Sequence, residues 1–164
     1  MPDAKQRGRS AGLRAVSVAV LSVLVVAAGS AAAATLSPAE QAFKTAYVKL
    51  VPTLNKASAA LVHAVDGSGH DTDAQIVTVF SGVAREWATA TKPLLALHAP
   101  ARESQIFAGI SRGSRAVEAD LLSVAESGRT HSVPAAKAAG TLLALDFNAL
   151  AKQVKLMKGK LGLP

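Results

Sequence analysis

The sequence predicts an all-α domain over residues 35–164, an up-down-up-down antiparallel four-helix bundle. Apolar residues recur every three or four positions through four long segments, and no segment alternates with a period of two. Short stretches rich in Gly, Pro and Asp separate the four segments. Short connections make consecutive helices antiparallel neighbours. In a bundle of this kind we expect neighbouring helices to cross at about 20°.

The first predicted helix begins at the tetrapeptide SPAE. Ser37 can cap the helix, Pro38 occupies its first turn, and Glu40 completes a capping box. We expect Pro52, inside this helix, to kink or break it, because proline lacks the N–H that a helix needs. The apolar stripe consists of Phe43, Tyr47, Leu50, Leu54, Ala57, Leu61 and Val65.

The second predicted helix opens with TDAQ at residues 72–75, which is another capping box. Pro93 predicts a second kink or break. Trp87 lies on the apolar stripe, where packing in the core explains it better than a ligand platform does. The stripe consists of Ile76, Phe80, Val83, Trp87, Ala90, Leu94 and Leu97.

The third and fourth predicted helices follow the same pattern. The third starts at Pro100 and ends near Gly128; the fourth starts around Ser132, with Pro134 in its first turn. The third stripe is Phe107, Ile110, Ser114, Val117, Leu121 and Val124. The fourth is Ala136, Gly140, Leu143, Phe147, Leu150, Val154, Met157 and Leu161.

Residues 1–34 have the features of an export signal. Basic residues open the chain, an apolar run fills residues 16–28, and small residues precede Thr35. We predict a signal peptide cleaved after Ala34 and a secreted protein that is extracellular or associated with the cell envelope; an uncleaved membrane anchor is the alternative. The absence of cysteine excludes disulfides and a cysteine-linked lipid anchor.

Charge gives little indication of a partner. The chain has 18 basic and 11 acidic residues, of which the leader holds four and one, so residues 35–164 carry 14 and 10, a net charge of +4. Such a charge, spread along the chain, does not indicate nucleic acid. Positive charge is concentrated only near the end, at Lys152, Lys155, Lys158 and Lys160. These lysines can complement the helix dipole or attract an anionic surface, either lipid or wall polymer.

The stretch LVHAVDGSGHDTDAQ, residues 61–75, is rich in potential metal ligands. In the expected topology this turn meets the turn between the third and fourth helices, which adds Glu126 and His131. Imidazole and carboxylate groups bind zinc, copper or nickel. The candidate ligands are His63, His70, Asp71, Asp73 and His131. A solvated polar turn explains the same residues, and no stripe contains the Glu-x-x-His spacing of bundle metal sites, so we predict no metal and no cofactor.

Small residues near this end allow a second interpretation. Ser58 and Gly140 are expected at one level of the bundle, with Val83 and Val117 beside them. This level is either closely packed or a cavity that opens at His70 and His131.

The chain has no motif that indicates catalysis. It has no cysteine nucleophile, no Gly-x-Ser-x-Gly, no phosphate-binding glycine loop and no His-Glu-x-x-His. We therefore predict no catalytic residues and a protein that is not an enzyme.

Several residues together resemble a group of known proteins. These are the leader, Phe43, Tyr47 and Leu50, the segment from Trp87 to Pro100, Asp120 and Leu121, and the ending Lys160-Leu-Gly-Leu-Pro. In this arrangement the chain resembles uncharacterised secreted or lipid-anchored, alanine-rich helical proteins of high-GC Gram-positive bacteria. The resemblance implies the fold and the compartment and brings no activity. The expected function is binding to a partner at or outside the cell envelope; the alternative is a small-ligand or metal carrier that uses the His/Asp-rich end.

Overall fold

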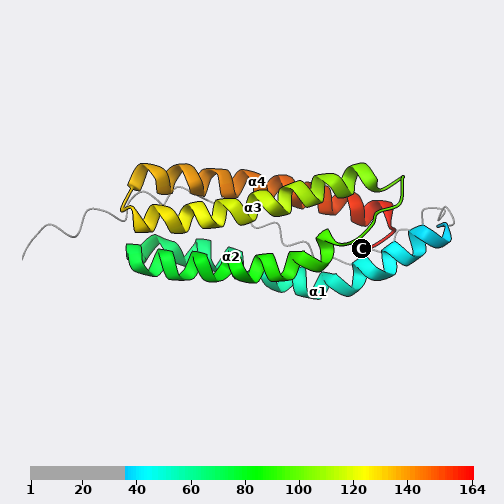
Figure 1. The fold of residues 1–164 in the computed structure, drawn as a ribbon, viewed down its shortest axis with the longest axis horizontal. Coiled ribbons are helices and arrows are strands. Elements are labelled where there is room, and N and C mark those ends of the chain that lie inside the picture. Colours follow the sequence, from blue (N-terminus) through cyan, green and yellow to red (C-terminus); the bar gives the residue numbers. More distant parts are fainter. Residues whose placement is uncertain (1–35) are drawn as a thin grey trace, which may run out of the picture.

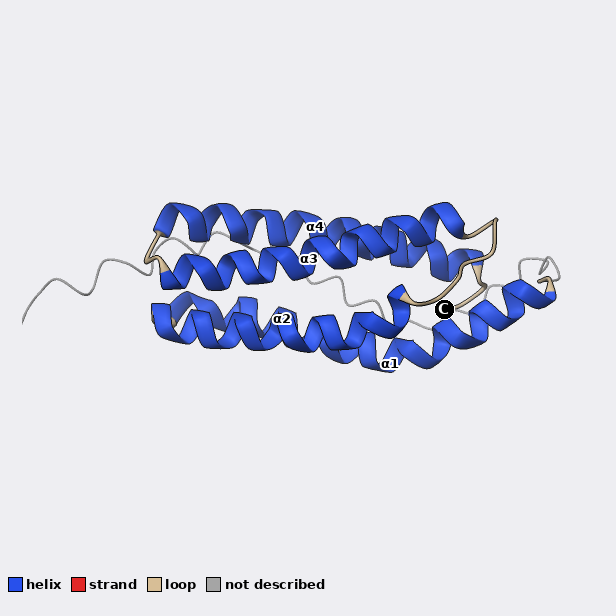
Figure 2. Ribbon diagram, in the orientation of Figure 1, coloured by secondary structure: helices blue, strands red, loops and turns tan. Residues whose placement is uncertain are grey.

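The computed structural model describes residues 36–164, which form four long helices and contain no strand (Figure 2). The helices are α1 (Pro38–Gly67), α2 (Asp73–Leu95), α3 (Ser104–Arg129) and α4 (Val133–Lys160), with a short 3₁₀ helix, η2 (Ser68–His70), after α1. They lie along one common direction (Figure 1). The all-α prediction with four helices is confirmed. The predicted leader and its cleavage site lie outside the described residues.

Local sequence signals fix most of the helix ends. The side chains of Ser37 and Glu40 form the capping box of α1, and those of Thr72 and Gln75 form the capping box of α2. Each cap satisfies a backbone N–H that the first turn of a helix leaves unpaired. Ser132 caps α4 through the N–H of Ala135.

Two predicted boundaries were wrong by a few residues. The chain turns at residues 100–103, where the N–H of Glu103 donates to the carbonyl of Pro100 at 3.0 Å, and α3 begins only at Ser104. Likewise α2 ends at Leu95, before the last residue of its stripe, Leu97. The chain needs these residues to cross from one helix to the next, and periodicity alone does not show this.

Neither internal proline breaks its helix. Pro52 lies in the middle of α1 and Pro93 in the last turn of α2, and both helices continue through them. The first half of α1 diverges in direction from its second half (Figure 1). A bend of this kind follows from the missing hydrogen bond at a helix-interior proline.

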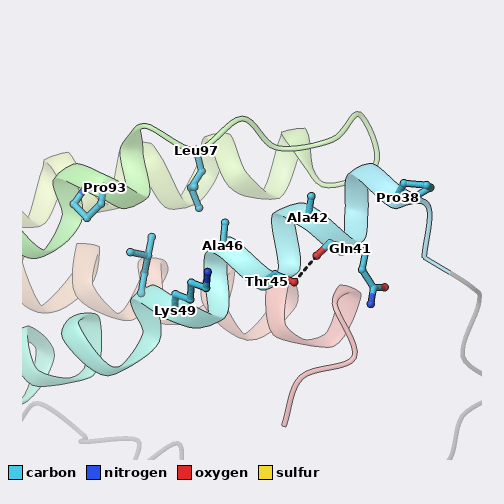
Figure 3. A pocket seen from close by; sticks show the side chains of 9 residues that line it. Pro38, Gln41, Ala42, Thr45, Ala46, Lys49, Pro93 and Leu97 are labelled. Carbon is cyan, nitrogen blue, oxygen red and sulfur yellow. Dashed lines mark hydrogen bonds between the residues drawn. The ribbon is translucent and has the colours of Figure 1, made fainter.

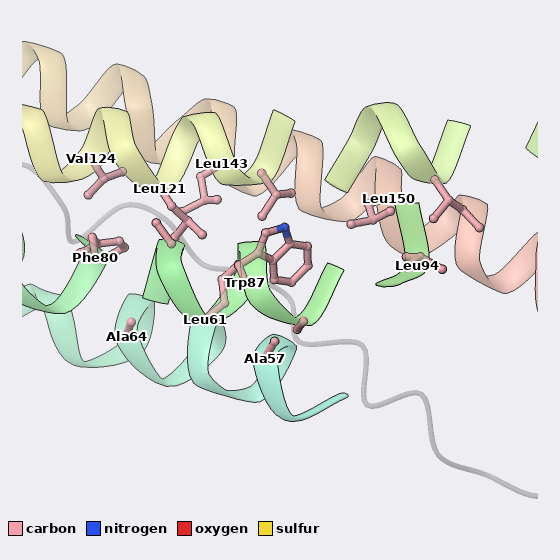
Figure 4. Close-up of a cluster of buried hydrophobic side chains, with 14 of the residues drawn as sticks. Ala57, Leu61, Ala64, Phe80, Trp87, Leu94, Leu121, Val124, Leu143 and Leu150 are labelled. Atoms are coloured by element: carbon pink, nitrogen blue, oxygen red, sulfur yellow. The ribbon is translucent and has the colours of Figure 1, made fainter. Parts of the chain in front are cut away.

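The four predicted stripes form the core, and none of their residues is exposed. Figure 4 shows side chains of all four helices meeting between them. On α3, Ile110, Val117 and Leu121 are fully buried. The prediction of the stripes is therefore confirmed.

Glycines allow α3 to approach both of its neighbours. A Cβ on Gly113 would lie 3.1 Å from the Cβ of Leu150 on α4, and one on Gly128 would lie 2.8 Å from the carbonyl oxygen of Asp73 on α2. Further along, Gly109 lies against Gln153. Between α3 and α4, the earlier residue of α3, Gly109, therefore meets the later residue of α4, Gln153. The helix α1 packs mainly against α2.

Candidate functional site

The turn after α3 contacts the start of α2, as the sequence predicted for this end of the bundle. Nδ1 of His131 lies 2.5 Å from Oδ2 of Asp73. Both side chains are largely open to solvent, with exposed fractions of 66% and 46%. The contact therefore joins two turns at the surface, where a paired charge contributes little stability.

His131 also belongs to the turn that closes α3, two residues after its last residue, Arg129. Its backbone has φ 52°, which is the left-handed region. The N–H of Ser132 donates to the carbonyl of Ser127 at 3.0 Å, and that of His131 to Gly128 at 3.3 Å. This is the hydrogen-bond pattern of a Schellman motif with histidine where glycine is usual.

The structure does not bring the five candidate metal ligands together. Of the five candidates, Asp73 and His131 make contact; His63 and His70 are exposed on α1 and η2, and Asp71 is half-buried. Within residues 36–164, no three His, Asp or Glu side chains gather so that they could hold a metal ion. At this end the described residues bring together only one pair of candidate ligands, Asp73 and His131. A metal site usually needs three or four protein ligands.

The four residues predicted to lie at one level of the bundle are all buried or half-buried. Val117 is fully buried and Gly140 is buried, while Ser58 and Val83 are half-buried. Nearby, Trp87 is buried and its Nε1–H donates to the carbonyl of Ser114 at 2.9 Å. Burial of these residues fits both alternatives of the sequence prediction, close packing and an enclosed cavity.

The opposite end of the bundle is where α1 begins. Glu40 is 3% exposed; its Oε2 accepts from the N–H of Ser37 at 2.6 Å, and its Oε1 pairs with Nη1 of Arg102 at 3.2 Å. The hydrogen bonds from Ser37, and then the charge of Arg102, hold the pKa of Glu40 below its ordinary value. The ion pair attaches the start of α1 to the crossing between α2 and α3.

An open groove lies beside this attachment, between α1 and the end of α2 (Figure 3). It exists because α1 has 30 residues and α2 has 23. A difference of seven residues leaves about 10 Å of α1 without a facing helix. The bend of α1 and the end of α2 at Leu95 thus leave the first turns of α1 only partly covered.

The groove has an apolar floor and one polar rim. On α1, residues four apart form two rows: Pro38, Ala42, Ala46 and Leu50 along the floor, and Gln41, Thr45 and Lys49 along the rim. Pro93 and Leu97 complete it from α2 and the crossing, with Leu97 pointing toward Ala46 (Figure 3). Its volume is about 760 Å³.

The rim provides few polar groups. The hydroxyl of Thr45 donates to the carbonyl of Gln41 at 2.9 Å, so its oxygen can still accept. Lys49 is exposed and supplies the one cation of the lining. Such a groove suits an elongated apolar molecule with an anionic group beside Lys49. Sequence reasoning missed it, because alanines four residues apart on a helix, such as Ala42 and Ala46, are also typical of close helix packing.

A second feature that sequence reasoning missed is a pair of carboxyl groups between α3 and α4. Asp120 is 9% exposed, and its Oδ2 is buried without a hydrogen-bond partner. Burial, followed by the charge of Asp146, raises the pKa of Asp120 to about 6. A signal was present: neither aspartate has a basic residue within one turn on its own helix.

No described helix is both long and apolar enough to cross a membrane. No protein-family model matches the chain, and neither a curated protein nor a solved structure matches it. The resemblance to secreted helical proteins of high-GC Gram-positive bacteria therefore stays a prediction.

Proposed function

We propose that this protein is an exported, non-enzymatic binding protein, and that the groove beside α1 holds its ligand at or outside the cell envelope. The ligand class that fits is an acyl chain or similar apolar molecule with an anionic head. The observation that carries the proposal is the groove itself, with its apolar floor and its single cation, Lys49. A volume of about 760 Å³ is within the range of small-molecule sites.

The proposal includes the finer architecture, an up-down-up-down bundle that follows a signal peptide at residues 1–34. The inverse order of the contacts between α3 and α4 supports antiparallel packing. The basic start and the apolar run of the leader support export. In that case the protein recovered from culture medium begins near Thr35, as N-terminal sequencing would show; an intact Met1 on membrane-bound protein would instead indicate an anchor.

Binding in the groove is tested with a dansyl-labelled undecanoic acid, whose fluorescence rises in apolar surroundings. Ala42 is exposed on the floor of the groove, so Ala42→Trp fills the groove without overpacking the core. We expect it to weaken binding of the probe at least tenfold. The matched control is Ala59→Trp, which changes an exposed alanine of α1 outside the groove and should bind like the unchanged chain.

The role of Lys49 needs a separate variant. Lys49→Gln should weaken binding of the carboxylate probe about tenfold and leave binding of the corresponding alcohol unchanged, because only the carboxylate forms a charge-assisted hydrogen bond. Equal affinity of the Ala42→Trp and Ala59→Trp proteins would place the probe elsewhere and overturn the proposal.

A further inference from the structure

The helix α4 carries apolar residues on two faces. Its inner stripe packs in the core, and a second line on its outer side consists of Leu142, Leu145, Ala149, Lys152 and Leu156. The spacing of this line is three, four, three and four, which keeps all five residues on one side of the helix. Its leucines are 53%, 60% and 54% exposed.

The alignment of these leucines is unusual. Single exposed apolar residues are normal on a protein surface, whereas a continuous apolar strip indicates an interaction site. Within residues 36–164 six large apolar side chains are exposed, and three of them lie on this line. The other three, Val48, Leu122 and Val133, lie on α1, on α3 and at the start of α4. The exposure of its three leucines shows that no described helix covers the outer line.

The charges beside the C-terminal half of this line have one sign. From Phe147 onward the chain contains four lysines and no acidic residue. Lys152 lies on the line itself, and Lys155 and Lys160 are exposed near it. Lysine stems can lie along an apolar surface while the ammonium groups reach outward to anions.

We propose that the outer face of α4 lies on an anionic lipid surface, with its leucines among the acyl chains and its lysines at the phosphate headgroups. An interfacial helix combines apolar and basic residues in this way. The charges argue against a second copy of the chain, since pairing two α4 helices would bring like charges together. The proposal is independent of the groove, which lies between α1 and α2.

The chain contains no cysteine, so a single introduced cysteine can be labelled uniquely. An environment-sensitive NBD fluorophore on Ala149→Cys, at the centre of the line, reports whether that face enters lipid. The control label is on Ala59→Cys, on an exposed face of α1. Because the label senses only its own surroundings, attachment of the full chain through its predicted leader does not by itself produce the signal.

With vesicles of phosphatidylcholine and phosphatidylglycerol at low salt, we expect a blue shift at position 149 and none at position 59. The shift should be lost at high salt and with pure phosphatidylcholine vesicles. Changing the four lysines to Gln should weaken the affinity for anionic vesicles, measured by titrating lipid against the shift, by about fivefold per lysine. Changing Leu142, Leu145 and Leu156 to Gln should abolish it, whereas the matched triple change of Val48, Leu122 and Val133 to Gln should not.

Three results would overturn the proposal: an unchanged spectrum at position 149 with anionic vesicles, equal shifts at positions 149 and 59, or equal shifts with neutral and anionic vesicles. A shift without lipid that grows with protein concentration would assign the face to a second copy of the chain instead. Circular dichroism of each variant checks that it is still helical.

Discussion

Single residues set how the helices of this bundle meet. Between α3 and α4, Asp120 lies beside the carboxyl group of Asp146. Neither aspartate has a basic residue within one turn on its own helix. Between α3 and α2, Gly128 lies so close to the first turn of α2 that a Cβ has no room. Gly128 and Asp120 are both buried, so a small chemical change at either should have a measurable effect.

The burial of Asp120 beside Asp146 predicts a stability that falls as the pH rises. The pKa of Asp120 is about 6 in the folded state against 3.8 without its surroundings. Because the folded state holds this proton more tightly than the unfolded state, the contribution is complete below about pH 4 and is lost as the pH passes through about 6. The free energy of unfolding should fall by about 1 kcal/mol between about pH 5 and pH 7.5, measured by urea denaturation.

Asp146→Asn separates this group from other titrations. The amide removes the like charge and can donate to Asp120, so the variant should be more stable than the unchanged chain at about pH 7.5 and should depend less on pH. A variant whose stability changes with pH as steeply as that of the unchanged chain would show that the pair is not responsible.

Gly128→Ala should destabilise the fold. The new Cβ would lie 2.8 Å from the carbonyl oxygen of Asp73 and 3.0 Å from Cγ2 of Val77, so α2 and α3 must separate. Overpacking costs about 1 to 3 kcal/mol, and the higher helix propensity of alanine offsets up to about 1 kcal/mol of that. In Gly82→Ala, where nothing lies within 4 Å, the propensity gain should appear alone. Equal thermal shifts for the two variants would contradict the close approach.

At the scale of the helix, the ends and bends of each element decide what the bundle leaves open. Local signals fix the capping boxes of α1 and α2, and Pro52 bends α1 without ending it. The groove follows from these element lengths, because α1 continues past the end of α2. The outer face of α4 is likewise a property of an entire helix, since its line of leucines appears only when the helix is viewed as a whole.

The end of α4 gives a prediction at this scale. Gly162 has φ 60°, and the N–H of Leu163 donates to the carbonyl of Lys158 at 2.9 Å, which closes a Schellman motif. Gly162→Ala should cost about 1 kcal/mol, because an L residue is strained in this region. Gly159→Ala lies inside the helix with nothing within 4 Å, and should stabilise slightly. Chemical denaturation of both variants measures the contrast, and a stabilised Gly162→Ala protein would exclude the motif.

At the scale of the whole molecule, the chain holds together by apolar packing without disulfides. The core runs the length of the bundle and draws side chains from all four helices (Figure 4). The two surfaces proposed to bind lie at the edge of this core or outside it, on residues that packing leaves exposed or half-buried. Changes at these surfaces can therefore test binding while leaving the fold intact.

The core itself is tested at Leu121, which is fully buried. Leu121→Ala should lower the free energy of unfolding by about 2 to 5 kcal/mol, because it removes apolar contacts and leaves a cavity. Leu142→Ala changes an exposed leucine and should cost less than about 0.5 kcal/mol in the absence of lipid. Similar costs at both positions in urea denaturation would mean that the core is not centred on α3.

The sequence by itself determined the helices and their buried faces. Capping boxes and three-four periodicity are local properties, which is why Ser37, Thr72 and the four stripes could be identified without coordinates. It also placed His131 and Asp73 at one end, because topology alone brings those turns together.

Only the tertiary structure decided how closely the helices approach and what their ends leave uncovered. Whether an alanine such as Ala42 faces a neighbouring helix or a groove depends on where α2 ends. The end of α2 depends in turn on how many residues the chain needs to cross to α3. Whether Asp120 meets Asp146 depends on the register between α3 and α4, two consecutive helices that pack against each other. Periodicity identifies the buried face of one helix, but it carries no information on the level at which two helices are aligned. That alignment determines both the groove at Ala42 and the pairing of Asp120 with Asp146.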